Sequence, residues 1–389
     1  MLRTIAFLIA AACLWAQTPR SVVKITGSLH KLVLFSDGTV GGWGDTRDGQ
    51  LGPIAAIPNV RGHAAAYVPI AIPGKAIDIA ATDRVSYVLQ DDGTVLALGW
   101  GNEGGLGCGE KCVEGHQEKP TAIPGLRDVV QIAAGGTVAF AIHRDGSVSA
   151  WGTRSGGLIP DGVKPQPCCP APKAVTPVKV PKLAGLKQIS VGRFGLGLTA
   201  DGHVQSWGIA DPALGRVTEP FSWSDPAEIP GLTDVTSIVA MEASGAALRT
   251  DGTVWVWGRN TQAGFGNGRQ SDEETSLAPQ RIPGLANVTA LSGARLGRHL
   301  IALLKDGTIR VWGNTDWGQG GMGIAGTNQP TPSAPKITSV KAVFAAGNNS
   351  FAVRRDNSVW IWGAGFKWPE GPEWPLGTNT KAPVPLALP

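Results

Sequence analysis

The side chains that most often carry out catalysis or bind metals are few and scattered in this chain. No His-Glu-x-x-His zinc motif and no Gly-x-Ser-x-Gly nucleophile motif stands in a suitable context, and no glycine-rich phosphate loop precedes a helix. The sequence therefore indicates no catalytic residue, no metal site and no cofactor. The six histidines are spread along the whole chain, at His30, His63, His116, His143, His203 and His299.

The most regular carboxylates belong to a phrase, Asp-Gly-x-Val-x-x-Trp-Gly, that occurs seven times. Asp-Gly supplies the positive φ angles of a two-residue hairpin turn, so we interpret these aspartates as turn residues and not as catalytic acids. In the seventh copy Asn357 replaces the glycine, and Asn tolerates the same backbone region. In the second copy Leu98 replaces the tryptophan. The aspartates are Asp37, Asp92, Asp145, Asp201, Asp251, Asp306 and Asp356.

The spacing of this phrase predicts the architecture. Successive aspartates lie 50 to 56 residues apart, so seven copies occupy almost the whole chain. Each turn joins two apolar strands, a third strand that ends in small residues precedes them, and a fourth short strand is expected near Ile-Pro-Gly-Leu, as at 123–126. Single sheets of this size cannot bury both faces, whereas seven set around an axis can. We predict an all-β, seven-bladed β-propeller of antiparallel four-stranded blades over residues 17–389, with tryptophans between the blades.

The amino terminus has the pattern of a secretory signal peptide. One positive charge at Arg3 is followed by an apolar run at 5–12 that is too short to span a bilayer comfortably. We predict a signal peptide at 1–16, with cleavage before Gln17, and hence a secreted, periplasmic or cell-surface protein. An alternative is a lipoprotein anchored at Cys13. A buried first strand is disfavoured, because the run lacks alternation.

Composition narrows the classes of partner. With 42% apolar and 16% charged residues, 54 glycines and 29 prolines, the chain has the balance of a folded, loop-rich protein. Its net charge is +4, and +3 without Arg3, which is too small to predict nucleic-acid binding. No segment after the signal is long and apolar enough to span a membrane. We expect a monomer.

Four cysteines remain after Cys13, an even number that favours disulfides in an exported protein. Cys108 and Cys112 are predicted on a long connection of the second copy, and Cys168 and Cys169 on that of the third. Both cross-blade bonds and the local pairs Cys108–Cys112 and Cys168–Cys169 are consistent with the sequence. The spacings do not match those of a structural zinc site.

These residues resemble the regulator-of-chromosome-condensation repeat, a family of seven-bladed propellers. The shared features are the small-residue strand, Asp-Gly-x-Val-x-x-Trp-Gly and a Gly-Gln-Leu-Gly element, here at 49–52. With the signal peptide, the resemblance points to exported bacterial propellers of this class, which include inhibitors that cap β-lactamases with one face. It implies binding through a loop-bearing face without naming the target. Nucleotide exchange on a small GTPase and chromatin binding are disfavoured by the signal and the balanced charge.

The topology predicts where a partner would bind. The corners between the first and second strands and the long third-to-fourth connections must lie on the face opposite the Asp-Gly turns, and variable loops on a rigid scaffold often carry recognition. The sixth corner is unusually long. Aromatic residues on the connections are further candidates: Trp223, Trp317, Phe366, Trp368 and Trp374. The candidate binding residues at the corners are Arg84, Arg193, Phe194, Glu242, Arg295, Arg298, His299 and Asn348.

We therefore expect a secreted, non-catalytic protein that recognises an extracellular or envelope protein, or a surface polymer. The alternative is an extracellular enzyme that acts on polysaccharide or peptide with residues at the axial face. That alternative requires clustered acids at the corners, and the sequence offers only Asp83 and Glu242 there.

Overall fold

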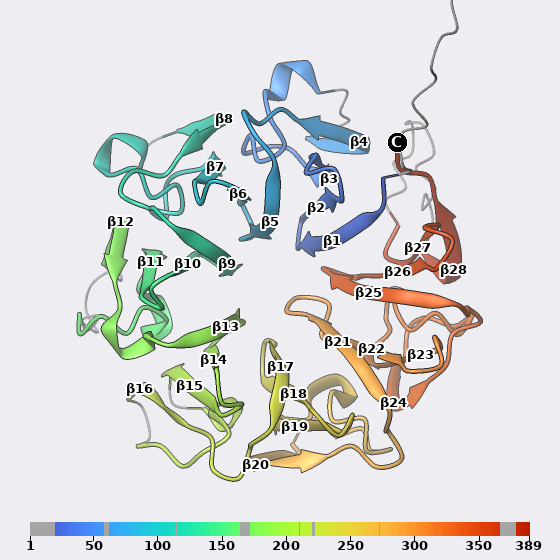
Figure 1. The fold of residues 1–389 in the computed structure, drawn as a ribbon. Helices are drawn as coiled ribbons and strands as arrows, with labels where there is room; N and C mark the ends of the chain where they lie inside the picture. Colours follow the sequence, from blue (N-terminus) through green and yellow to red (C-terminus); the bar gives the residue numbers. More distant parts are fainter. Residues whose placement is uncertain are drawn as a thin grey trace, which may run out of the picture.

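In the computed structural model the chain forms a ring of seven four-stranded antiparallel sheets around a central axis (Figure 1). The structure describes residues 20–57, 62–113, 115–163, 172–209, 211–219, 222–271, 273–365 and 379–389. The predicted fold is confirmed. The signal peptide at 1–16, Cys13, Cys168, Cys169, Phe366, Trp368 and Trp374 lie outside the described residues.

The four strands of each blade follow one another in the chain, and the first strand lies nearest the axis (Figure 1). The first three blades are β1 (Val22–Gly27), β2 (His30–Phe35), β3 (Val40–Asp45) and β4 (His63–Ile70); β5 (Ala76–Ala81), β6 (Val85–Gln90), β7 (Val95–Trp100) and β8 (His116–Ala122); and β9 (Val129–Gly135), β10 (Val138–His143), β11 (Val148–Thr153) and β12 (Lys173–Lys179).

The other four blades repeat the pattern. They are β13 (Leu186–Val191), β14 (Gly195–Thr199), β15 (Val204–Ile209) and β16 (Trp223–Glu228); β17 (Val235–Ala240), β18 (Ser244–Arg249), β19 (Val254–Arg259) and β20 (Thr275–Arg281); β21 (Val288–Ala294), β22 (His299–Leu304), β23 (Ile309–Asn314) and β24 (Asn328–Ser333); and β25 (Val340–Ala346), β26 (Asn349–Arg354), β27 (Val359–Gly363) and β28 (Thr380–Leu386).

Helical structure in the described part of the chain is limited to short 3-10 turns, and none of these is long and apolar enough to cross a membrane. Most follow the third strand of a blade. They are η1 (Ile54–Ala56), η2 (Glu110–Cys112), η3 (Ser155–Gly157), η4 (Pro181–Leu183), η5 (Pro212–Leu214) and η6 (Thr261–Ala263).

The Asp-Gly phrases form the predicted hairpin turns between the second and third strands. At the fifth turn, Asp251 Oδ1 accepts hydrogen bonds from the backbone N–H of Thr253 at 2.9 Å and from its hydroxyl at 2.6 Å. Asn357 has a φ of 68°, as expected for the residue that stands in place of glycine. The fourth strands end just before the Ile-Pro-Gly-Leu segments, so the predicted position of that strand is confirmed.

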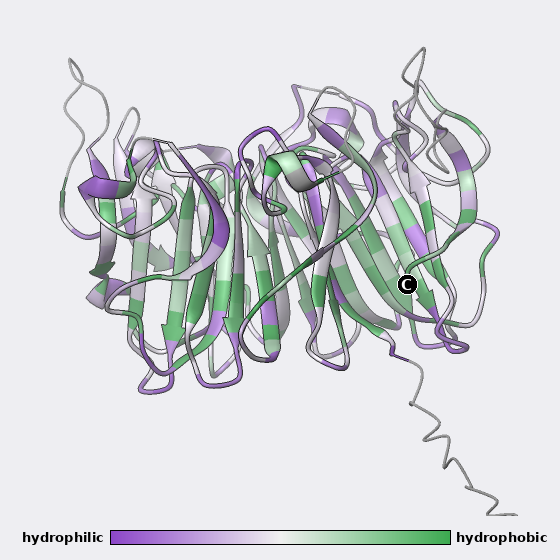
Figure 2. Ribbon diagram, turned by 90° about the horizontal axis from the view of Figure 1, so that it is seen from above, coloured by the Kyte–Doolittle hydropathy of each residue, from purple (hydrophilic) through white to green (hydrophobic). Residues whose placement is uncertain are grey.

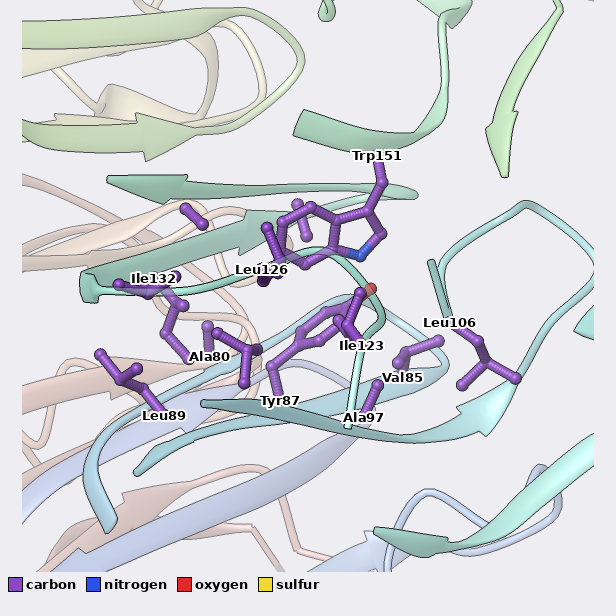
Figure 3. Packing of buried hydrophobic residues seen from close by; sticks show 14 residues of the cluster. Ala80, Val85, Tyr87, Leu89, Ala97, Leu106, Ile123, Leu126, Ile132 and Trp151 are labelled. Atoms are coloured by element: carbon purple, nitrogen blue, oxygen red, sulfur yellow. The ribbon is translucent and has the colours of Figure 1, made fainter. Parts of the chain in front are cut away.

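Tryptophans of the repeat phrase fill the spaces between neighbouring blades, as predicted. The Trp151 ring is fully buried against blade 2, and its Nε1–H donates to the Gly105 carbonyl at 2.9 Å (Figure 3). Trp257 donates in the same way to the Ala213 carbonyl of blade 4 at 2.8 Å. Leu98 takes the equivalent place in blade 2 and packs in the core of blade 1 without a polar group.

The ring closes by side-chain packing between the last and first blades. All four strands of blade 7 come from the carboxyl-terminal segment, so the described residues of blade 1 contribute no strand to it. Trp43 of blade 1 instead contacts Phe351 of blade 7 edge to face, with ring centroids 6.0 Å apart. Val22, Ile25 and Ala346 bury this same junction.

Candidate functional site on the loop-bearing face

The two faces of the ring differ in the chain segments that they carry. Tight, polar Asp-Gly turns lie along one edge of the disc, and longer loops lie along the other (Figure 2). We call these the turn-bearing face and the loop-bearing face. The loop-bearing face carries the corners between first and second strands and the connections between third and fourth strands, as the topology predicted.

The repeated aspartates are engaged in their own turns. The hydroxyl and the backbone N–H of Thr308 both donate to Asp306 Oδ1, and these bonds hold the pKa of the Asp306 carboxyl below its ordinary value. Asp145 and Asp356 have the same bonds from Ser147 and Ser358, with pKa values lowered by the same cause. Carboxylates occupied in this way are structural, in agreement with the sequence analysis.

The centre of the loop-bearing face is crossed by Arg295, from the sixth corner. Its guanidinium donates to both oxygens of Asp83 at 2.6 Å and lies 3.4 Å from Glu242. Asp83 belongs to blade 2 and Glu242 to blade 5, so one side chain connects three blades. These three side chains are only 19 to 30% exposed. Arg295 and Asp83 also line the central channel, whose volume is about 240 Å³.

Three corners pack directly against one another beside this ion-pair cluster. A Cβ on Gly297 would overlap the carbonyl oxygen of Gly347, so the sixth and seventh corners are in backbone contact. A Cβ on Gly347 would lie only 2.6 Å from the Ser28 carbonyl oxygen in the first corner. Only glycine permits this approach. We call residues 28–29, 295–298 and 347–348 the corner sector.

The corner sector exposes apolar and cationic side chains together. Leu29 and Leu296 are exposed large hydrophobic residues, and Trp317, on the third-to-fourth connection of blade 6, is 47% exposed. Gln319 of that connection approaches the Gly297 carbonyl, with its Nε2 at 3.5 Å. Arg298 is exposed and forms no ion pair with any described residue. This arrangement suits contact with a protein surface.

The predicted binding residues therefore have different roles. Arg295, Arg298 and the half-buried Asn348 lie in the corner sector, and Glu242 pairs with Arg295. Arg193 is exposed in the fourth corner, away from the corner sector.

Two of the predicted binding residues are buried. Phe194 is 1% exposed and belongs to the core of blade 4, while His299 is completely buried. Phe194 is the last residue of the fourth corner and His299 is the first residue of β22, and both side chains point into the core. As placed, they offer no surface to a partner.

Arg84 belongs to a separate cluster between blades 1 and 2. Its Nε donates to Asp48 at 2.6 Å, and its guanidinium carbon lies 3.0 Å from the centroid of the Trp100 ring. Such stacking and pairing hold an arginine in one orientation. Asp48 is not among the predicted site residues, although it directly precedes the Gly-Gln-Leu-Gly element that marks this connection.

Two buried histidine–serine pairs resemble catalytic dyads but are structural. His299 Nε2 lies 2.9 Å from the Ser350 hydroxyl, which donates to the Gln319 carbonyl at 2.9 Å. His30 and Ser86 repeat this arrangement between blades 1 and 2, with 2.8 Å between the two groups. All four side chains are completely buried, so neither serine can reach a substrate. Burial lowers the pKa of His30 to about 3 and that of His299 to about 4.

The described cysteines form a local bond. Cys108 and Cys112, on the connection of blade 2, are joined by a disulfide. Of the two arrangements that the sequence left open, the structure has the local one for this pair. Among the described residues, no three His, Cys, Asp or Glu side chains are grouped closely enough to hold a metal ion.

Trp223 is the other described aromatic candidate. It begins β16 and is 38% exposed, and its ring packs close to Gly157 in η3 of the neighbouring blade. A hollow lined by Gly157, Ile159 and Trp223 lies at this junction. Trp223 therefore covers the edge of a blade while part of its ring stays exposed.

Comparisons with known proteins agree with this architecture. Residues 92–142 and 251–302 match the Regulator of chromosome condensation (RCC1) repeat. The Ultraviolet-B receptor UVR8 of Arabidopsis thaliana is 26% identical over 373 residues, which cover 89% of this chain and 78% of UVR8. Two segments of the chain therefore match the RCC1 repeat, and the chain folds as a seven-bladed propeller.

Two solved structures have the same fold. Human WBSCR16 superposes with a TM-score of 0.76 at 18% identity, covering 90% of this chain and 95% of that one. Prp20p of Saccharomyces cerevisiae superposes with a TM-score of 0.73 at 21% identity, covering 95% and 88%. At these identities the likeness shows the fold alone. UVR8, WBSCR16 and Prp20p are eukaryotic proteins, and none of them bears on the predicted export from a bacterium.

Proposed function

We propose that this chain is a non-catalytic binding protein that grips a protein partner with the loop-bearing face of its propeller. One observation carries the proposal. The pairing of Arg295 with Asp83 and Glu242 fixes the sixth corner across the channel, while Leu296 and Arg298 of the same corner remain exposed.

The chemistry of the corner sector suits protein recognition. Aromatic and arginine side chains dominate the energetics of most protein interfaces, and Trp317 and Arg298 lie on the same blade. The corner is held by ion pairs and by glycine contacts to its neighbours, so little conformational entropy is lost on binding. A rigid rim of apolar side chains with a free cation would accept a partner that presents an apolar surface and a carboxylate.

Related propellers support the mode of action without identifying the partner. UVR8 is a receptor, and Prp20p binds Gsp1p and histones. We do not transfer these partners, since a net charge of +4 on 389 residues is too small to predict binding to nucleic acid. What we transfer is the use of the propeller as a rigid binding scaffold.

The proposed location of the partner follows from the amino-terminal sequence. The apolar run at 5–12 after Arg3 supports export, so the proposed partner is an extracellular or envelope protein. A surface polymer would be the corresponding non-protein ligand. The disulfide Cys108–Cys112 is consistent with an oxidising compartment. We expect the protein to act as a monomer.

The enzyme alternative is less well supported. It requires free acidic groups near the axis, and the two corner acids that the sequence offered, Asp83 and Glu242, both face Arg295. A carboxylate with both oxygens bonded to a guanidinium is already engaged within the protein and is poorly placed to act on a substrate. No second function is therefore proposed.

Site-specific photocrosslinking tests the proposal. A photoreactive phenylalanine replaces Leu296 in residues 17–389, and the protein is exposed to the envelope fraction and medium of the source cells. We expect one stoichiometric protein adduct. The matched control carries the same group in place of Thr308, at the turn of the same blade on the opposite face, and should give none.

Substitutions then test the chemistry. Arg298→Ala and Trp317→Ala should each weaken capture of the crosslinked partner at least about tenfold, which corresponds to 1.4 kcal/mol. Adducts formed equally at positions 296 and 308, or capture that is unchanged in both variants, would contradict binding by the loop-bearing face. Turnover of an envelope polymer by the purified protein would instead support the enzyme.

A further inference from the structure

The turn-bearing face has a feature that recurs in all seven blades. The second residue of each innermost strand has no partner on the neighbouring strand, so each pair contains a β-bulge. A bulge turns the extra side chain out of the sheet. The bulge residues are Val23, Ile77, Val130, Lys187, Thr236, Thr289 and Lys341.

Four blades carry a polar side chain at the bulge, and each of them is bonded within its own blade. The hydroxyl of Thr236 donates to the Leu248 carbonyl at 3.2 Å, and that of Thr289 donates to the Leu303 carbonyl at 3.3 Å. Lys187 Nζ reaches the Ala200 carbonyl at 3.4 Å, and Lys341 bonds Asn357. In these four blades the bulge side chain therefore finds a hydrogen-bond partner within its own blade.

Blades 1, 2 and 3 differ from these four. Their bulge residues are aliphatic and highly exposed: Val23 by 51%, Ile77 by 49% and Val130 by 43%. The three blades are consecutive in the ring, so the innermost strands β1, β5 and β9 that carry these residues are neighbours around the axis (Figure 1). We call Val23, Ile77 and Val130 the aliphatic arc. Single exposed aliphatic residues are ordinary, but a contiguous group at a position that is polar elsewhere marks an interaction surface.

Two residues of the aliphatic arc border a hollow of about 610 Å³. Ile77 and Val130 line it, and Lys24 and Gln131 line both the hollow and the central channel. The hollow therefore lies at the mouth of the channel on the turn-bearing face, on the opposite side of the molecule from the corner sector.

The charged groups of the hollow have an excess of cations. Lys24 is paired with Asp78 at 2.7 Å, so these two charges compensate each other. Arg144 and Lys187 are exposed and form no ion pair with any described residue. His143 uses both ring nitrogens, toward the Arg127 carbonyl and the Ser149 hydroxyl. The surface thus combines aliphatic side chains with two cations that no described carboxylate neutralises.

We propose that Val23, Ile77 and Val130, with Arg144 and Lys187, form a second docking surface for a protein segment that presents aliphatic side chains next to a carboxylate. Burial of β-branched side chains supplies the affinity. The cations select an acidic segment over a basic one. This surface is separate from the one in the proposed function, so one chain would join two partners through opposite faces.

Selection from a displayed library of random peptides tests the proposal. The immobilised protein, residues 17–389, should enrich sequences in which Leu, Ile or Val lies beside Asp or Glu. An enriched peptide is then synthesised with a fluorophore, and its affinity is measured by anisotropy. Failure to enrich any family of peptides, or enrichment of basic ones, would overturn the proposal.

The chain itself supplies conservative variants. Ile77→Thr and Val130→Thr place at these bulges the residue that blades 5 and 6 already carry there, so the fold should be kept. The double variant should lose at least about tenfold in affinity for the peptide. Lys187→Gln with Arg144→Gln should weaken binding and reduce its salt dependence. Thr236→Val, at the same position in blade 5, should leave the affinity unchanged.

Two further measurements distinguish this surface from the corner sector and from a self-association interface. The Arg298→Ala variant should bind the peptide with unchanged affinity, because Arg298 lies on the opposite face. Each of the two proposed surfaces can therefore be contradicted without the other. If sedimentation shows that the protein self-associates and that the double threonine variant does not, then the arc binds a second copy of the chain. That result, or unchanged peptide affinity in the double variant, would overturn the proposal.

Discussion

At the scale of single residues, two histidines are unusual because they are completely buried and neutral. His30 and His299 each occupy the first position of a second strand, completely buried beside the serine of the next blade. Desolvation is the main cause that lowers both pKa values, and for His30 the neighbouring Lys31 lowers it further. Both imidazoles stay neutral in the fold and protonate near pH 6.5 in the unfolded chain.

We expect the free energy of unfolding to fall between pH 7 and pH 5. In this range the unfolded chain binds protons at both positions and the folded chain does not, so each histidine destabilises the fold by about 2 kcal/mol at pH 5. The turn aspartates, whose pKa values are lowered, contribute stability that is lost only below about pH 4. His203 acts in the opposite direction, because Glu228 raises its pKa, but it is exposed.

Chemical denaturation at pH 7 and pH 5 measures this effect. His299→Gln keeps a polar group beside Ser350 and should remove about half of the pH dependence. His203→Gln is the matched control and should leave the loss of stability in place. Equal stability of the natural protein at the two pH values would show that these imidazoles are not the groups that titrate.

At the scale of the element, the tryptophans of the repeat phrase join each blade that carries one to the blade before it. Trp151 and Trp257 are both completely buried and both donate to a carbonyl of the preceding blade. The acceptors differ. The Gly105 carbonyl also accepts from the Tyr87 hydroxyl at 2.6 Å, whereas the Ala213 carbonyl accepts only the Trp257 bond among the described residues.

This difference predicts unequal costs for the same substitution. Trp→Phe leaves a comparable void at both places, but at Trp257 it also leaves a buried carbonyl without a donor, which costs about 1 to 3 kcal/mol. Trp257→Phe should therefore destabilise the protein by about 1 kcal/mol or more beyond Trp151→Phe. Denaturant midpoints of the two variants measure this difference in stability. Equal midpoints would contradict the role that we assign to the unpaired Ala213 carbonyl.

Most of these elements could be predicted because each is determined locally. Asp-Gly and Asn357 specify their turns through backbone φ alone, and the repeated spacing then gives the number of blades. Apart from the tryptophans between the blades, the contacts between different copies could not be predicted. The burial of Phe194 and His299 depends on the residue at which each second strand begins, and a one-residue difference there reverses the direction of a side chain.

The bulge residues show what comparison among the repeats could have added. Aligning the seven innermost strands places Val23, Ile77 and Val130 in one column with two threonines and two lysines. That contrast is visible in the sequence. To interpret this contrast, the register of the strands was needed, because the register shows that these residues are bulges whose side chains point out of the sheet.

At the scale of the whole molecule, the cluster around Arg295 ties together segments that are remote in the sequence. Arg295 and Asp83 are 212 residues apart and meet across the channel. The repeats are alike, so nothing in the phrase indicates which corners meet. The signal was the extra length of the sixth corner, which allows Arg295 to reach over the mouth of the channel.

We expect Arg295→Met to destabilise the ring by about 1 to 3 kcal/mol, because it leaves two partly buried carboxylates without their cation. Arg298→Met, on the same corner but without an ion pair in the described part of the chain, should change stability by no more than about 0.5 kcal/mol.

A double-mutant cycle separates the pair from its surroundings. If the two groups interact directly, Arg295→Met combined with Asp83→Asn should cost less than the sum of the single variants, by about 1 kcal/mol. The free energies of unfolding by denaturant give each corner of the cycle. Strict additivity would mean that the corner is held by its glycine contacts to blades 7 and 1, and the preorganisation that we assign to Arg295 would then belong to Gly297 and Gly347.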